Sequence, residues 1–167
     1  MTQPIRFFLD ECLSHLVVER QIRDSLQLYG ADAEVAHLLT KFPKGMPDLE
    51  WIPELSKEGG WIVISPDRGS HSKKDERLPD ICREMDVTHV IMSAALHRRN
   101  MYYKALAITT CWPALLDAAS YPAGTGFSLS LRGERFCFRK VSDAKSVQVP
   151  TTHQTALFDA TDVQDEE

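Results

Sequence analysis

The sequence predicts a three-layer α/β/α fold, in which helices cover both faces of a central, mainly parallel sheet, followed by an antiparallel hairpin. Two observations carry this prediction. Short apolar segments of strand length alternate along the chain with segments of helical periodicity, which is typical of parallel strands joined by crossover helices. Later, two segments that alternate apolar and polar residues flank a turn containing glycine, which indicates a hairpin.

Four segments have the apolar composition and the length of buried strands, and four others have helical spacing. The predicted strands are 5–9, 33–39, 61–65 and 88–93. The predicted helices are 14–29, 49–58, 78–85 and 100–119. The order of these elements predicts right-handed crossovers and a parallel sheet.

Glycine and proline mark where the helices end or bend. Gly30 follows the first helix as a C-terminal cap, and Gly59 follows the second. Pro53 is expected to kink or restart the second helix, and Pro113 to kink or divide the last. Residues 41–47 are predicted to form a loop.

The end of the chain divides into a hairpin and a tail. Residues 127–131 and 136–141 form the predicted hairpin around Arg-Gly-Glu-Arg, so the folded domain is expected to span 1–141. Residues 142–167 are polar and acidic, and we expect a tail that is disordered or ordered only by a partner.

Composition places the chain among ordinary globular domains. It has 167 residues, 43% hydrophobic and 26% charged, and no apolar run of membrane-spanning length. The start lacks the pattern of a secretion signal, so we expect a cytoplasmic protein without a membrane partner. The cysteines show no paired spacing and are expected to be reduced thiols: Cys12, Cys82, Cys111 and Cys137.

Three aspartates stand at positions that predict a divalent metal site. Asp10 and Asp67 each follow a predicted strand, and Asp48 stands at the start of a helix. All three can lie along the carboxyl edge of the sheet, where α/β folds place their ligand crevices. Converging carboxylates suit hard cations such as Mg²⁺. The alternatives are a helix cap for Asp48 and turn-forming roles for the other two.

The net charge of −5 is unevenly distributed. Residues 151–167 carry five acids and no base, so the rest of the chain is neutral. Basic residues outnumber acids in the stretch that follows Asp67: Arg68, Lys73, Lys74, Arg77, Arg83, Arg98, Arg99 and Lys104. They form either a rim that holds a phosphodiester backbone beside the acidic site or an ordinary solvated helix face.

Three motifs together resemble a known family: Phe7-Phe8-Leu9-Asp10-Glu11, then Gly45-Met46-Pro47-Asp48-Leu49-Glu50-Trp51-Ile52, then Val63-Ile64-Ser65-Pro66-Asp67-Arg68. In order and spacing they look like the compact PIN-like nuclease domains, which include the toxins of toxin–antitoxin pairs. The resemblance covers roughly residues 5–95. It implies a ribonuclease dependent on Mg²⁺ or Mn²⁺, with RNA as substrate and an antitoxin protein as a partner. Assembly with a second copy of the chain is left open.

The resemblance also implies roles for individual residues. Asp10, Asp48 and Asp67 become the catalytic and metal-binding carboxylates, with Glu11 as a further candidate ligand. The Ser65 hydroxyl would orient the Asp67 carboxylate by a hydrogen bond without binding the metal itself. The substrate-binding candidates are Arg68, Lys73 and Lys74. The implied reaction is phosphodiester hydrolysis by metal-activated water.

One acid of the family pattern has no clear equivalent. Full-length PIN nucleases carry a further glutamate on a helix between the positions that match Asp10 and Asp48. Here Glu34 lies in a predicted strand, and Glu11 and Glu50 are candidates only by proximity. Three carboxylates therefore remain for the metal.

Histidines and aromatic residues give weaker signals. The six histidines show no ligand spacing and receive no predicted role. Tyr102, Tyr103 and Trp112 could stack on RNA bases, but their helix is expected to bury them. Two other functions stay open: a noncatalytic interaction module, and a receiver-like phosphoacceptor domain with Asp67 as acceptor and Ser93 after the following strand.

Overall fold

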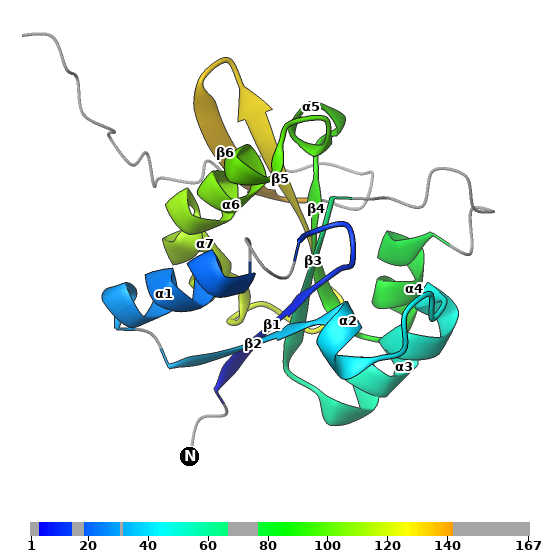
Figure 1. Ribbon diagram of the computed structural model, residues 1–167. Helices are drawn as coiled ribbons and strands as arrows, with labels where there is room; N and C mark the ends of the chain where they lie inside the picture. Colours follow the sequence, from blue (N-terminus) through cyan, green and yellow to red (C-terminus); the bar gives the residue numbers. More distant parts are fainter. Residues whose placement is uncertain (1–3, 15–18, 31, 67–76, 142–167) are drawn as a thin grey trace, which may run out of the picture.

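A six-stranded sheet forms the centre of the molecule in the computed structural model (Figure 1), which describes residues 4–14, 19–30, 32–66 and 77–141. The strands are β1 (Ile5–Leu9), β2 (Ala33–His37), β3 (Trp61–Ser65), β4 (Thr88–Met92), β5 (Gly126–Arg132) and β6 (Arg135–Lys140). Their order across the sheet is β2-β1-β3-β4-β5-β6, and all neighbours are parallel except β5 and β6. The predicted fold class is confirmed.

Helices cover both faces of this sheet. They are α1 (Arg20–Tyr29), α2 (Leu38–Lys41), α3 (Asp48–Glu58), α4 (Leu78–Glu84), α5 (Ala94–His97), α6 (Met101–Thr110) and α7 (Trp112–Ala118). One face carries α1, α6 and α7, and the other carries α2, α3 and α4, while α5 lies beyond the carboxyl end of β4 (Figure 1). The layered arrangement follows from strands that are apolar on both faces.

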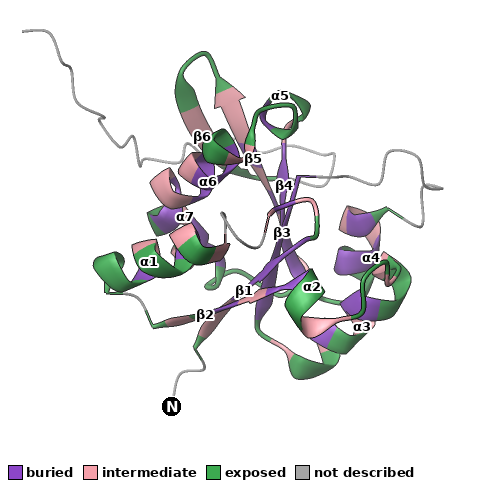
Figure 2. Cartoon of the chain, viewed as in Figure 1, coloured by how far each residue is buried: buried purple, intermediate pink, exposed green. Residues whose placement is uncertain are grey.

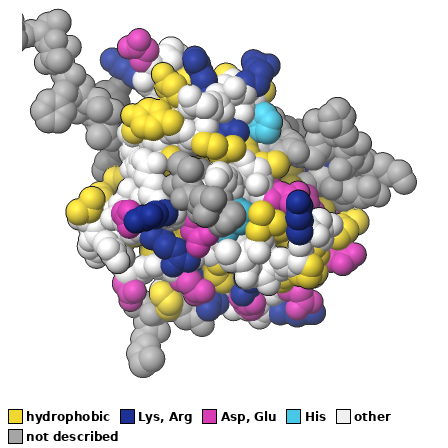
Figure 3. Space-filling view, viewed as in Figure 1, with side chains coloured by type: hydrophobic (Ala, Val, Ile, Leu, Met, Phe, Trp, Pro, Cys, Tyr) yellow, Lys and Arg dark blue, Asp and Glu magenta, His cyan; other side chains and the backbone are white. Residues whose placement is uncertain are grey.

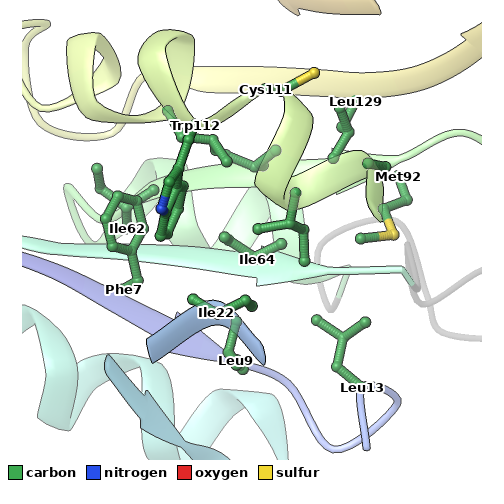
Figure 4. Close-up of a cluster of buried hydrophobic side chains, with 14 of the residues drawn as sticks. Phe7, Leu9, Leu13, Ile22, Ile62, Ile64, Met92, Cys111, Trp112 and Leu129 are labelled. Atoms are coloured by element: carbon green, nitrogen blue, oxygen red, sulfur yellow. The ribbon is translucent and has the colours of Figure 1, made fainter. Parts of the chain in front are cut away.

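Alternating side chains of the strands fill two hydrophobic clusters. Phe7 and Leu9 belong to the cluster under α1, α6 and α7, and Phe8 belongs to the cluster under α3 and α4. Trp112 of α7 lies against Phe7 with ring centroids 4.8 Å apart (Figure 4). The strands are accordingly buried along β3 and β4 and in the second half of β1 (Figure 2). Burial on both faces explains why these segments read as continuous apolar runs.

The second predicted strand is shorter than expected. The sequence predicts a strand over 33–39, but β2 ends at His37, and α2 begins at the next residue. The His37 side chain accepts a hydrogen bond from the backbone N–H of Leu39 and forms a capping box with Thr40. A buried histidine that caps a helix therefore stops the strand.

The remaining predicted elements agree closely with the structure. Pro113 coincides with the division between α6 and α7, and Gly30 caps α1 in the left-handed conformation, with φ 69°. The helix around Pro53 is continuous as α3. The hairpin continues the sheet, because β5 pairs with β4. The tail and residues 15–18 of the first predicted helix lie outside the described residues.

All four cysteines lie within the described ranges and form no disulfide, and two of them are buried, Cys82 and Cys111. Across the described ranges, no helix has both the length and the apolar character needed to cross a membrane.

Where β4 and β5 pair, a glycine makes room for a buried histidine. His89 is 3% exposed and lies opposite Gly126 in the register. A Cβ atom added at Gly126 would lie 2.8 Å from Nε2 of His89, closer than real contacts allow. Burial lowers the pKa of His89, so the ring stays neutral in this packing.

Gly126→Ala is expected to destabilise the fold by about 1–3 kcal/mol, because the new methyl group overpacks the site. Urea denaturation measures this change. In the His89→Ala background the same substitution should cost little, since the clashing ring is gone. Equal costs in both backgrounds would show that the contact is unimportant.

Candidate metal centre

The strand order places a topological switch point at the carboxyl ends of β1 and β3. From β1 the chain moves to β2 on one side, and then crosses to β3 on the other side. Such a reversal is a topological switch point, and open α/β sheets bind their ligands in the crevice beside it. Asp10 directly follows β1, and Ser65 is the last residue of β3.

The Asp10 carboxylate is buried and held at both oxygens. Asp10 is 6% exposed. Oδ2 accepts a hydrogen bond from Oγ of the fully buried Ser65 at 2.6 Å, and Oδ1 accepts one from the backbone N–H of Glu11 at 2.6 Å. The Asp10 N–H donates to the Ile64 carbonyl, so the pairing of the strands extends to this residue. A buried carboxylate needs such partners.

Asp48 lies on the same side of the sheet as Asp10. Because side chains alternate along a strand, Asp10 points to the face of Phe8, which α3 and α4 cover. Asp48 is the first residue of α3, and its Oδ1 accepts a hydrogen bond from the Trp51 indole N–H at 3.0 Å. Trp51 in turn stacks on Phe8, with ring centroids 5.1 Å apart. A chain of contacts therefore links the Asp48 carboxylate to the strand that Asp10 ends.

The helix-cap alternative for Asp48 is wrong. Pro47 occupies the N-cap position of α3, and its side chain makes no capping hydrogen bond. The Asp48 side chain bonds to an indole, because Trp51 stands three residues later on the same helix face.

The buried thiol of Cys82 lies within electrostatic reach of both carboxylates. Cys82 is a fully buried residue of α4, in the cluster that contains Phe8. Burial raises the pKa of its thiol above the usual range, and the negative charges of Asp48 and Asp10 raise it further. Two carboxylates from distant parts of the chain thus act on one side chain, which makes this thiol unreactive.

The other predicted site residues fall into two groups. Asp67, Arg68, Lys73 and Lys74 lie outside the described residues. Glu11 is described and exposed, and its backbone N–H supports the Asp10 carboxylate. The sequence predicts that Ser65 orients Asp67. In the described part of the chain, the Ser65 hydroxyl donates a hydrogen bond to Asp10. Within the described ranges no three metal-ligating side chains cluster.

The two other glutamates considered as a fourth acid lie differently. Glu34 is in β2, as expected, and forms an ion pair with Arg6 at 2.9 Å. This pair lies opposite on neighbouring strands, four positions before Asp10 along β1. Glu50 is exposed in the first turn of α3.

His37, which received no predicted role, supports the turn after Asp10. Its Nδ1 accepts from Leu39 N–H, so Nε2 carries the proton and donates to the Leu13 carbonyl at 2.5 Å. The Leu13 N–H donates to the Asp10 carbonyl. The fully buried His37 lies opposite Leu9 in the register, and therefore fastens the turn from Asp10 to Leu13 to the end of β2.

Fold and site together define an α/β domain with an acidic site at the switch point of a parallel sheet. The profile of the PIN-like domain family matches residues 5–94, which is more than half of the chain. The chain therefore belongs to the PIN-like domain family, whose members are generally nucleases that use divalent metals. Neither curated proteins nor solved structures gave a significant match.

Two substitutions of His37 separate its two hydrogen bonds. His37→Asn is expected to keep the α2 cap, because asparagine is a good N-cap residue, but it is too short to reach the Leu13 carbonyl. His37→Leu removes both bonds and should cost about 1–3 kcal/mol of stability more than the asparagine variant. Hydrogen exchange at Leu13 should accelerate in both variants. Unchanged Leu13 protection in the asparagine variant would contradict the role in the turn.

Proposed function

We propose that this protein is a ribonuclease of the PIN type, dependent on Mg²⁺ or Mn²⁺, and the toxin of a toxin–antitoxin pair. The observation that carries the proposal is the buried Asp10 carboxylate at the switch point, with Asp48 on the same side of the sheet. Family membership supplies the reaction class.

The donor set fits a hard divalent cation. Asp10 and Asp48 offer carboxylate oxygens, and Asp67 is a third candidate by sequence. An ionised carboxylate has about four acceptor sites, so it can combine hydrogen bonding with metal ligation. A bound divalent ion would lower the pKa of a coordinated water and neutralise charge developing on the phosphate.

The remaining side chains of the site act by positioning. Ser65 and the Glu11 N–H fix the orientation of the Asp10 carboxylate, and the Trp51 indole fixes that of Asp48. Residues that hydrogen-bond to the metal-coordinating side chains in this way contribute strongly to metal affinity. Arg68, Lys73 and Lys74 are proposed, from sequence, to hold the RNA backbone.

Asp10→Asn and Asp48→Asn are each expected to abolish Mn²⁺-dependent cleavage of a labelled single-stranded RNA. Ser65→Ala should lower cleavage about 10- to 100-fold, as removal of an outer support does. Asp24→Asn is the matched control, because Asp24 is exposed on α1. Cleavage that survives Asp10→Asn would overturn the proposal.

Metal binding can be measured without reference to catalysis. Calorimetric titration with Mn²⁺ should give binding to the parent protein and weaker binding to both asparagine variants. We expect the Asp24→Asn control to bind like the parent. Equal Mn²⁺ affinity in all four proteins would place the metal elsewhere.

A noncatalytic interaction module is the second candidate. Both oxygens of Asp10 accept hydrogen bonds from the protein, which would by itself stabilise the turn after β1. In that case Asp10→Asn weakens the fold and no RNA is cleaved by the parent. The receiver-like alternative receives no support, because residues 5–94 match the PIN-like domain family, and Ser93 caps α5 by accepting from Leu96 N–H.

A further inference from the structure

The turn between α5 and α6 exposes two arginines and two tyrosines together. We call Arg98, Arg99, Tyr102 and Tyr103 the Arg–Tyr patch. Tyr102 is 61% exposed and Tyr103 is 38% exposed, so the expectation that the helix buries these rings is wrong, whereas Trp112 is buried as expected.

Contacts within the patch keep its aromatic and cationic groups side by side. The Arg99 guanidinium lies 5.2 Å from the centroid of the Tyr103 ring, and the two tyrosine rings meet edge to face at 5.9 Å. The inner face of α6 is formed by Ala105 and Ile108, which are fully buried. The tyrosines point outward because they lie on the side of α6 opposite the face that packs against the core.

Two caps make the backbone of the patch rigid. The Ser93 hydroxyl caps α5, and Oδ1 of Asn100 caps α6 by accepting from Tyr103 N–H at 3.1 Å. Backbone hydrogen bonds from Arg98 N–H to Ala94 and from Arg99 N–H to Leu96 close the turn between them. A surface ordered before binding loses less entropy when a partner binds.

No acidic residue stands near the patch in the sequence to compensate its positive charge. Residues 87–116 contain no aspartate or glutamate, and of their three Lys and Arg residues Arg98 and Arg99 are exposed while Lys104 is buried. Lys and Arg side chains, with an acidic one among them, lie beside hydrophobic side chains at the end of the molecule where α5 and the β5–β6 hairpin lie (Figure 3). Cations interleaved with exposed aromatics complement a single nucleic-acid strand, whose phosphates are anionic and whose bases stack.

The patch lies on the same edge of the sheet as Asp10. α5 follows the carboxyl end of β4, and only β3 separates β4 from β1. With neighbouring strands about 4.8 Å apart, the ends of β1 and β4 are about 10 Å apart. Asp10 points to the face that α3 and α4 cover, whereas α6 lies on the opposite face, so a single RNA strand reaches both surfaces by passing over this edge of the sheet.

We propose that the Arg–Tyr patch binds single-stranded RNA beside the acidic site, with bases stacked on the tyrosines and phosphates held by the arginines. The identity of the strand rests on the proposed ribonuclease function. The patch lies beyond residues 5–94, so it is a feature of this chain outside the part that the family profile matches.

The test measures binding without cleavage. An RNA of about 10 nucleotides, a length within the site sizes of single-strand binding modules, is titrated by fluorescence anisotropy in EDTA. The protein is the full chain carrying Asp10→Asn. Adding Tyr102→Ala and Tyr103→Ala should weaken binding at least about fivefold. Tyr29→Ala, which removes an exposed tyrosine at the far end of α1, should leave binding unchanged.

Arg98→Gln with Arg99→Gln tests the role of the arginines in holding phosphates. The salt dependence of binding should become shallower by about 0.7 in log–log slope for each phosphate that the variant no longer neutralises. Lys57→Gln removes an exposed charge from α3 and should not change the slope. Thermal melting followed by circular dichroism confirms that each variant is folded.

The outcomes separate this inference from the proposed function. If the parent cleaves RNA while the patch variants bind as tightly as the parent, the inference fails and the nuclease stands. If no metal supports cleavage but the patch variants no longer bind RNA, the nuclease fails and the binding surface stands. Absence of RNA binding by the parent, or equal weakening in the control variants, overturns the inference.

Discussion

The buried carboxylate of Asp10 is the constraint on which the arrangement of the site depends. A charge in this position is costly unless hydrogen bonds compensate it, and its partners come from distant parts of the chain. Ser65 reaches it only when β1 and β3 pair in the observed register, with Leu9 opposite Ile64. The turn that presents it is fastened by His37 at the end of β2. The three strands around the switch point are thus specified by one side chain as well as by their apolar residues.

Helix α3 depends on the same part of the sheet from the other direction. Its Trp51 fills the space against Phe8 and at the same time donates its indole N–H to Asp48. Burying a large aromatic ring stabilises the packing of helix on sheet, and the polar end of that ring orients the carboxylate. Cys82 of α4 packs in the same cluster as Phe8 and Trp51, and burial raises the pKa of its thiol, so this side chain contributes packing to the site and no negative charge.

The sequence predicts the sheet well because strands buried on both faces appear as apolar runs. Asp10 and Asp48 can be picked out from the sequence because Asp10 directly follows such a run and Asp48 stands at the start of a helix. The Trp51–Asp48 bond could also have been found, since the residues are three positions apart on one helix. Ser65 and Asp10 are 55 positions apart, and His37 bonds to a carbonyl 24 positions away, so both contacts require the strand order and register. The prediction for the tyrosines is wrong because it rests on aromatic character rather than on helix phase; Ala105 and Ile108 mark the inner face.

Residues after 94 are integral to the fold, although the family profile ends there. β5 pairs with β4, and Trp112 of α7 packs on Phe7 in the strand that leads to Asp10. Without α6 and α7, much of the larger hydrophobic cluster would be exposed to water, including Ile64 and Val90 of the central strands. The segment that completes this core also begins with the Arg–Tyr patch. The hydrophobic core therefore fixes the patch at the edge of the sheet where Asp10 lies, with α6 on one face and the Asp10 side chain directed to the other, so the distance between the two surfaces is set by the core and not by a flexible linker.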